Sequence, residues 1–325
     1  LGRKMSKSLG NYILPEEVIS VHGADTLRYY LIGATGPGLD LSYNQEDAKL
    51  KNKNLGVLWN IHNFVLDLAK TTDLNPAKLD VNIVEKNFGV EEKYILSRLH
   101  STIQLVTQCF GENRLNEVPL LVEELFLDLS RTYIHLVREK SSVGSVEEKH
   151  AVVFTIYAVL LETLKLFAVV VPFVAEKMYQ ALKTAFGLPT ESIHLFDWPV
   201  VDKKLINPSL EKNMIVSQRI VQSALACREK AQLGVRWPVK NIEVVTSDAD
   251  VEVAVEAMEE LIKVQANVKE VHVHQKLPRI KETVSIDHGK IGVLFGSASP
   301  KVLAKLSLTP ANKLVDELAK EGKIT

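Results

Sequence analysis

The sequence contains little cysteine, and its two cysteines stand far apart. Cys109 and Cys227 are the only ones in 325 residues, and neither lies in a paired-cysteine motif. This spacing argues against a disulfide scaffold and against a cysteine-based structural zinc site, and it is typical of proteins from a reducing compartment. The nine histidines are scattered and include no His-Glu-x-x-His pair. We therefore predict no metal site.

An excess of one charge and long apolar runs are also missing. Lys and Arg number 39 against 40 for Asp and Glu, so a nucleic acid would need a local basic face. The most apolar stretch, 167–174, is interrupted by Pro172 and is shorter than the roughly 20 apolar residues of a membrane span. No signal-peptide pattern opens the sequence. We expect a globular cytoplasmic protein that does not contact a membrane.

Apolar residues at three- and four-residue spacing predict helices over most of the chain. Two short helices are expected at 15–20 and 25–32, before a Gly-Pro-Gly break at 36–38. Longer helices with short connections then predict an antiparallel bundle. On the first long helix, Trp59 and His62 fall on the apolar stripe and Asn54 falls off it. The long helices are expected at 45–70, 95–110, 122–137, 147–167 and 172–182.

After residue 240 the period of the apolar residues changes from 3.6 to 2. Strands are expected at 242–246, 268–274, 283–286 and 290–295, with helices at 251–263 and 309–320. The predicted fold class is therefore mainly α, an antiparallel helical bundle with a small α/β C-terminal appendage. The predicted divisions are 1–44 for an N-terminal loop and the segment behind it, 45–190 for the bundle, 191–240 for a connector and a long helix, and 241–325 for the appendage.

The clearest chemical motif lies at the start of the chain. It reads Lys4-Met5-Ser6-Lys7-Ser8 and continues with Gly10-Asn11. Five such residues alone are typical of a solvated basic loop, but further matches follow in order at 15–19 and 22–29. Together they resemble the second signature of class I aminoacyl-tRNA synthetases and the stem-contact region behind it. The segment 1–44 is thus interpreted as a truncated signature loop and stem-contact region.

The resemblance implies a role for each residue of the loop. In the family the loop closes over ATP, with Mg²⁺ present, while an aminoacyl-adenylate forms. Lys7 is then the most critical residue, Lys4 assists it, and Met5, Ser6 and Ser8 shape the loop. The chemistry is consistent, because attack on the α-phosphate increases the negative charge that ammonium groups stabilise. Small Ser and Gly residues let such a loop open again.

The resemblance continues through the bundle, which it identifies as an anticodon-binding bundle. Leu58-Trp59-Asn60, the run 128–133 and His194–Pro199 resemble landmarks of the isoleucine, valine and leucine subgroup. The segment 228–238 is similar to isoleucyl enzymes, which implies tRNA(Ile) as partner, whereas 34–40 is closer to valyl enzymes. A valyl fragment is therefore one alternative. A stand-alone RNA-binding or scaffolding module is the other, and the intact motif at 4–8 argues against it.

The chain lacks the nucleotide-binding domain that such a loop serves, with its His-x-Gly-His-type signature. We therefore expect an excised fragment that needs an upstream catalytic domain of the same chain and is inactive alone. What the fragment itself offers is RNA contact. Arg residues suit phosphates and splayed bases, and Trp suits stacking on unpaired bases, although a buried Trp that anchors the appendage is an equally plausible role. The candidate RNA-binding residues are Arg131, Arg138, Arg228, Lys230, Arg236 and Trp237.

Overall fold

A computed structural model describes residues 4–275, 288–309, 311, 313–314 and 317. The chain divides into two compact units, Leu1–Gln222 and Ser223–Thr325. The first unit is helical throughout its described part, and the second contains a small parallel sheet. The predicted fold class, mainly α with a small α/β appendage, is confirmed. The four-part division of the chain stays a prediction.

The first unit begins with the two short helices that the sequence predicts. They are α1 (Pro15–His22) and α2 (Ala24–Ala34). Pro15 occupies the first turn of α1, where its fixed φ suits a helix and no amide hydrogen is needed. Between the helices lies Gly23 with φ +83°, a conformation that favours glycine. The chain therefore turns sharply between α1 and α2 at this glycine.

The bundle consists of long helices around a central one, α9 (Val146–Phe167). Helix α9 packs against α3, α5, α6 and α10, so most of its surface is buried. It is apolar enough and long enough to cross a membrane, but 67% of its most apolar window is buried inside the protein. Helix α9 therefore lies at the centre of the bundle. The surrounding helices are α3 (Gln45–Thr71), α5 (Val90–Gly111), α6 (Val118–Asp128) and α10 (Pro172–Phe186).

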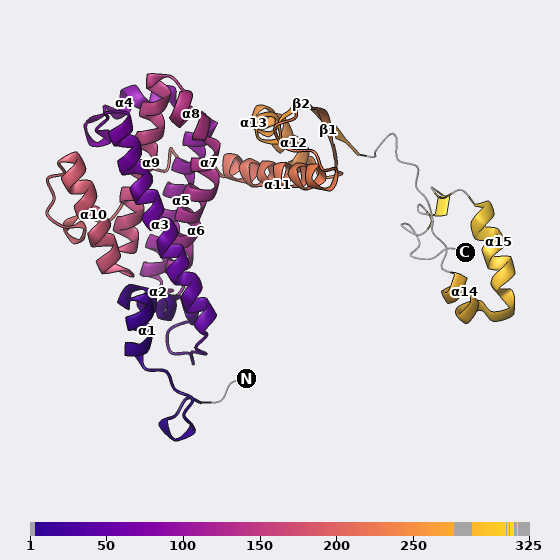
Figure 1. The fold of residues 1–325 in the computed structure, drawn as a ribbon, viewed down its shortest axis with the longest axis horizontal. Helices are drawn as coiled ribbons and strands as arrows, with labels where there is room; N and C mark the ends of the chain where they lie inside the picture. The colour runs from indigo at the N-terminus through magenta and orange to yellow at the C-terminus, as the bar shows by residue number, and fades with distance from the viewer. Residues whose placement is uncertain (1–3, 276–287, 310, 312, 315–316, 318–325) are drawn as a thin grey trace. The chain divides into compact units, whose positions relative to one another are not determined.

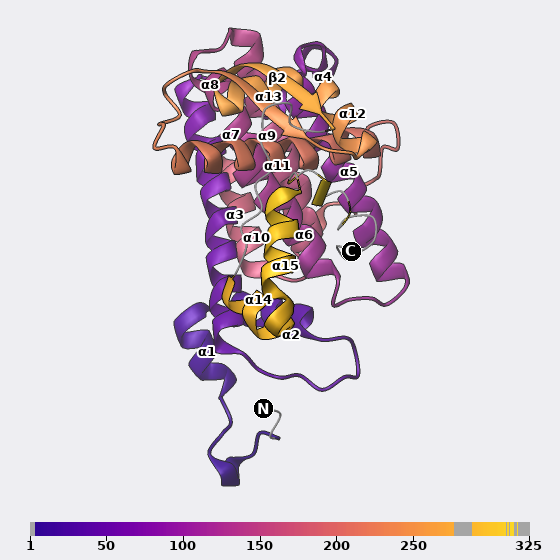
Figure 2. The same cartoon turned by 90° about the vertical axis from the view of Figure 1, so that its right-hand side faces the viewer.

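Short segments connect these helices. Helices α1 and α2 lie at one end of the bundle, and α4 and α8 lie at the other (Figures 1 and 2). The predicted single helix at 122–137 is interrupted by a π-helical turn, Leu129–Tyr133, which sequence periodicity does not reveal. The short elements are the 3₁₀ turns Lys7–Leu9, Pro76–Lys78, Glu85–Asn87 and Ile193–Leu195, with the helices α4 (Val81–Val84), α7 (Ile134–Leu136) and α8 (Arg138–Val143).

The predicted buried face of α3 is wrong in two positions. Asn54 is buried, although the apolar stripe excludes it, and Trp59 is 37% exposed. His62 is buried as expected, with its ring 5.4 Å from that of Trp59. The stripe fails here because α3 packs against α2, α6, α9 and α10, so its buried surface is wider than one apolar face.

Helix α11 (Pro208–Lys230) begins in the first unit and ends in the second. The second unit continues with β1 (Val239–Val245), α12 (Ala249–Ala257), α13 (Glu259–Ala266) and β2 (Val268–His274). The two strands pair in parallel, with Val239 opposite Val268 and Val245 opposite His274. A parallel pair needs a crossover, which α12 and α13 provide.

The last described helices are α14 (His288–Phe295) and α15 (Ser299–Leu308), joined by a 3₁₀ turn at Gly296–Ala298. The predicted strand at 290–295 is wrong, since this stretch is part of α14. A short apolar run does not distinguish a strand from a helix by its periodicity. The predicted strand at 283–286 lies outside the described residues, as does most of the predicted helix at 309–320.

Candidate nucleotide loop and nucleic-acid interface

The loop at 4–11 is closed by the side chain of Asn11. Its amide oxygen accepts from the Ser6 backbone N–H at 2.9 Å, and its amide nitrogen donates to the Lys4 carbonyl at 3.2 Å. The Ser6 hydroxyl lies 3.1 Å from that of Ser8 and accepts from the Leu9 N–H. Gly10 has φ +61°, which favours glycine. The sequence motif therefore forms a compact hairpin-like loop.

The predicted ATP-contacting residues lie together on this loop. Lys4 and Ser8 are exposed, Met5 is 43% exposed and Ser6 is partly covered. Lys7 lies in the 3₁₀ turn, and its side chain is outside what the structure describes. The described loop has two lysines and two hydroxyls but no carboxylate between residues 4 and 11. It is suited to contact phosphates, and its own residues do not fit a Mg²⁺ site, which takes carboxylate oxygens.

Arg131 and Arg138 lie on the segment that follows α6, and both are exposed. Arg131 belongs to the π-helical turn, and Arg138 begins α8. Tyr133, between them, is buried and donates through its hydroxyl to the buried carboxylate of Glu92 at 3.2 Å. Burial raises the pKa of Tyr133 well above its ordinary value, and Glu92 raises it further. This buried tyrosine fixes the helix beneath the two exposed arginines.

Lys140 is held close to the bundle, although it lies only two residues from Arg138. Its ammonium is 2.9 Å from Glu91 and 3.3 Å from Glu92. Burial alone would lower the pKa of Lys140, but the hydrogen bond to Glu91 and the negative charges of Glu91 and Glu92 raise it. Its charge is thus neutralised within the protein, whereas no ion pair of Arg131 or Arg138 is found among the described residues.

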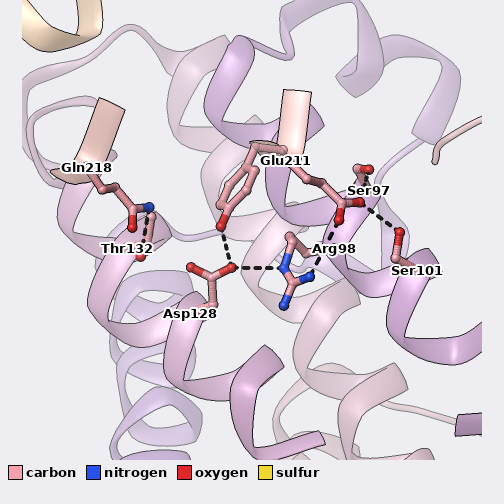
Figure 3. A network of polar contacts seen from close by, with 8 residues as sticks. Ser97, Arg98, Ser101, Asp128, Thr132, Glu211 and Gln218 are labelled. Atoms are coloured by element: carbon pink, nitrogen blue, oxygen red, sulfur yellow. Dashed lines mark hydrogen bonds and ion pairs between the residues drawn. The ribbon is translucent and has the colours of Figure 1, made fainter. Parts of the chain in front are cut away.

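A polar network joins the first half of α11 to the bundle beside the π-helical turn (Figure 3). Arg98 on α5 lies between two carboxylates, with Nε 3.3 Å from Asp128 and Nη1 3.5 Å from Glu211. Glu211 on α11 also accepts from the hydroxyls of Ser97 and Ser101. These contacts fix the start of α11 on α5 and on the end of α6.

Further contacts of the same network reach the π-helical turn itself. The Tyr94 hydroxyl donates to Asp128 at 2.5 Å, and Gln218 donates to the Thr132 hydroxyl at 3.2 Å. Burial lowers the pKa of Arg98, but Asp128 and its other partners more than offset this and leave it raised. Burial also raises the pKa of Tyr94, with Asp128 adding to the shift. Arg98 therefore stays charged and Tyr94 neutral.

Arg228 is one of the predicted RNA contacts, but in the structure it is buried among backbone carbonyls. Only 6% of it is exposed. Its guanidinium donates to the carbonyls of Ala266 at 3.0 Å and Asn267 at 2.7 Å. It also donates to the carbonyls of Trp237 at 2.9 Å and Gly234 at 3.4 Å. With four carbonyls bound and almost no exposed surface, Arg228 is not available for a phosphate.

Lys230, Arg236 and Trp237 lie on the surface close to Arg228. All three are exposed, and Trp237 is 71% exposed. Within the second unit Trp237 is not buried, and its interpretation as an anchor of the appendage stays a prediction. The structure brings these three together in the second unit, whereas Arg131 and Arg138 lie in the first. His272 and His274 are on a polar strand face, where His274 is 2.6 Å from Glu243.

Sequence reasoning missed two features that shape these surfaces. Asn11 is part of the quoted motif, yet its closing role depends on a fold of the loop that the motif does not specify. The Arg98 network joins residues more than 100 positions apart, such as Ser97 and Glu211, and no local pattern signals it. Among the described residues, no group of three His, Cys, Asp or Glu is placed to hold a metal ion.

Comparison with protein families gives two matches along the chain. Residues 92–246 match the anticodon-binding domain of tRNA ligase. Residues 1–44 match the class I tRNA synthetases of the isoleucine, leucine, methionine and valine group. The first match includes Arg131, Arg138 and Arg236, and the second includes the whole loop at 4–11.

Similar curated proteins are isoleucine–tRNA ligases of archaea. That of Methanocella arvoryzae is 34% identical over 328 residues, which cover 99% of this chain and 30% of that protein. That of Thermococcus kodakarensis is 36% identical over 308 residues, covering 94% of this chain and 28% of that protein. The chain thus spans about three tenths of the length of the curated relatives that it matches.

Among solved structures, a similar chain comes from a ternary complex of LeuRS, tRNA and LeuAMS from Agrobacterium radiobacter K84. It has a TM-score of 0.49 and 19% sequence identity, and it covers 63% of this chain and 23% of that chain.

Proposed function

Since this chain belongs to the class I aminoacyl-tRNA synthetases, as the anticodon-binding region of an isoleucine–tRNA ligase, we propose that it binds tRNA(Ile). The intact enzyme would activate isoleucine with ATP and transfer it to this tRNA in two steps. The match of residues 92–246 to the anticodon-binding domain is the observation that carries the proposal. We place the protein in the cytoplasm, where tRNA is charged.

Within the first unit, Arg131 and Arg138 are the proposed phosphate and base contacts. Both are exposed on the segment that the Arg98 network and Tyr133 hold in place. An exposed guanidinium without a carboxylate partner is free to pair with a phosphate or to stack on a splayed base. Lys140 is left out because Glu91 and Glu92 already neutralise it. Lys230, Arg236 and Trp237 are the proposed contacts of the second unit.

The loop at 4–11 supplies the second part of the proposal. Lys4 and Lys7 would stabilise the charge that develops on the phosphates of ATP during adenylate formation. Mg²⁺ would be held by groups outside this loop, because the loop has no carboxylate. A loop of eight residues cannot by itself enclose both adenine and isoleucine, so the chain without a nucleotide-binding domain should not form adenylate. Pyrophosphate exchange by the purified chain would contradict this.

The experiment that tests RNA binding is a competition among tRNAs. The chain is titrated into labelled tRNA(Ile), and unlabelled isoleucine, valine and leucine acceptors compete for it. We expect tRNA(Ile) to compete best. Preference for the valine acceptor would support the alternative of a valine–tRNA ligase region, and equal competition by all RNAs would support a non-specific RNA-binding module.

Two variants and one matched control test whether tRNA binds at the surface around Arg131 and Arg138. Arg131→Ala and Arg138→Ala should each weaken binding and reduce the slope of log affinity against log salt by about one, because each removes one phosphate contact. Arg114→Ala is the control, since Arg114 is already paired with Glu112 and Glu117. Equal slopes for all three variants would remove Arg131 and Arg138 from the interface.

A further inference from the structure

The turn that follows α11 is exposed on its outside and fixed from beneath. Residues 231–238 are all exposed, whereas Arg228 under them is buried. The Trp237 N–H donates to the Gly234 carbonyl at 3.1 Å and closes a four-residue turn. One guanidinium nitrogen of Arg228, Nη1, donates to both ends of this turn, the carbonyls of Gly234 and Trp237. The turn therefore has a defined shape despite its exposure.

Asn267 holds the same turn from the other side. Its side-chain amide donates to the Val235 carbonyl at 2.7 Å, and its own carbonyl accepts from Arg228 and from the Val239 N–H. Asn267 has φ +49°, a left-handed conformation at the end of α13 that asparagine adopts more readily than most residues. The start of β2 and the end of α11 are thus joined through the turn.

The charge around the turn is mainly positive. No ion pair of Arg228 is found among the described residues, so its charge faces only carbonyl dipoles. Lys230 and Arg236 are exposed beside it, and Glu229 is the exposed acid next to them. A positive charge that is not neutralised inside the protein attracts an anion to the surface above it.

We propose that the turn 234–237 is a preformed site for one unpaired nucleotide of the bound tRNA, and that Arg228 and Asn267 are its positioning residues. The exposed Trp237 ring offers a face on which a base stacks, and Arg236 binds the phosphate of the same nucleotide. Because Arg228 and Asn267 fix the turn before RNA arrives, little conformational freedom is lost on binding. This inference rests on the proposed tRNA-binding function.

An apolar partner surface is the competing occupant. Leu233 and Val235 are exposed next to Trp237, at 47% and 48%, and a protein could cover all three. The cations around the turn favour RNA, because Lys230 and Arg236 would need acidic partners in a protein interface, whereas every nucleotide carries a phosphate. If a protein covers the turn instead, Trp237→Ala does not weaken tRNA binding.

Trp237 fluorescence reports directly on stacking. In the full chain, Trp59→Phe and Trp198→Phe leave Trp237 as the single tryptophan. Titration with a tRNA(Ile) transcript should quench its emission, because a stacked base quenches indole fluorescence. Trp237→Ala, made in the natural sequence, should weaken binding by about 5- to 100-fold, and Trp237→Phe should retain most of the affinity.

Two positioning variants then separate shape from charge. Asn267→Gly keeps the left-handed backbone available and removes only the hydrogen bond to Val235. Arg228→Lys keeps the charge but cannot bind four carbonyls. Each should weaken tRNA binding by roughly 3- to 10-fold and reduce the quenching of Trp237, while the slope of log affinity against log salt stays unchanged.

The charge variant Arg236→Ala should instead reduce the slope by about one. Arg219→Lys, an exposed position on the same helix, is the matched control and should change neither quantity.

The outcomes distinguish this site from the broader function. If the natural chain does not bind tRNA, the proposed function fails and this site fails with it. If the chain binds tRNA but Trp237→Ala binds equally well, only the site is overturned. If Arg228→Lys does not fold, Asn267→Gly tests the positioning role instead. Full quenching of Trp237 emission by tRNA in folded Asn267→Gly would overturn that role.

Discussion

The two ends of α11 are held by arginines in opposite ways. At its start, Arg98 comes from another helix and lies between the carboxylates of Asp128 and Glu211. At its end, Arg228 belongs to α11 itself and donates to four backbone carbonyls. The first arrangement neutralises the arginine, and the second leaves its charge in place. An arginine thus supports α11 by charge at one end and by hydrogen-bond geometry at the other.

This difference separates support from recognition. An arginine paired with two carboxylates adds little to the field outside the protein, so the start of α11 is suited to fixing helices. An arginine that faces only carbonyls fixes a turn and still adds positive charge near the surface. The end of α11 is therefore the better place for an anion.

Arg98→Met should have the largest effect. Removal of Arg98 leaves Asp128 and Glu211 close together without their cation, and such a loss costs 3–5 kcal/mol for a fully buried pair. Because Arg98 is 22% exposed, we expect about 2–4 kcal/mol less stability in the first unit. Urea denaturation, followed by hydrogen exchange of α5 amides, measures it.

The double variant Arg98→Met with Glu211→Gln is the control for this charge argument. It removes one of the two unpaired carboxylates, so its cost should be smaller than the sum of the two single costs. Additive costs would mean that Arg98 stabilises the contact between α11 and the bundle by packing alone.

Arg228→Met should cost less, roughly 1–3 kcal/mol, in the second unit. The exposed carbonyls of Gly234 and Trp237 can bind water in its place, and the Asn267 carbonyl keeps the Val239 N–H as donor. The Ala266 carbonyl is the acceptor that loses its buried partner. Hydrogen exchange of the β1 and β2 amides measures the loss. A cost equal to that of Arg98→Met would erase the distinction between the two ends.

Much of the fold followed from the sequence because the signals are local. Apolar spacing located α3, α5, α9 and α10 to within five residues at each end, since each buries a face against several neighbours. The π-helical turn was missed because one inserted residue does not change the apolar pattern enough to be read. The predicted strand at 290–295 failed because a run of five apolar and small residues after Lys290 has no distinctive period.

The site divides in the same way. The loop at 4–11 could be predicted because its motif is contiguous in the chain. The surroundings of Arg228 could not, because its acceptors Ala266 and Asn267 lie nearly 40 residues away. Exposure of Trp237 was equally hidden, since a tryptophan beside a proline and arginines suits a buried anchor as well as a stacking face. The surroundings of Arg228 and the exposure of Trp237 both depend on tertiary contacts, which no local pattern in the sequence shows.

Gln232→Gly should have a small stabilising effect at the end of α11. Gln232 has φ +55° and lies just past the helix, where its N–H donates to the Glu229 carbonyl and the Leu233 N–H donates to that of Arg228. Glycine adopts this left-handed conformation without strain and is the usual residue there. We expect the second unit to gain about 0.5–1 kcal/mol. Gln222→Gly, at an exposed position within the helix, is the opposing control and should lose a similar amount.

Part of the pH dependence of the first unit should arise at the start of α11. His100 on α5 accepts from the Asp202 N–H at 3.1 Å, on the connector that leads into this helix. Burial lowers the pKa of His100 in the folded protein, against the raising effects of Asp202 and Glu162. The unfolded chain binds a proton near pH 6.5, which the folded protein takes up only at lower pH. Stability from this residue is therefore complete above about pH 6.5 and decreases as the pH falls toward the lowered value.

Urea denaturation between pH 8 and pH 5 tests this dependence. His100→Asn keeps a polar acceptor and cannot titrate, so its stability should fall less steeply below pH 6.5 than that of the natural chain. His135→Asn replaces an exposed histidine of the same unit and is the matched control. If both variants follow the natural chain, His100 does not contribute to the pH dependence of the first unit.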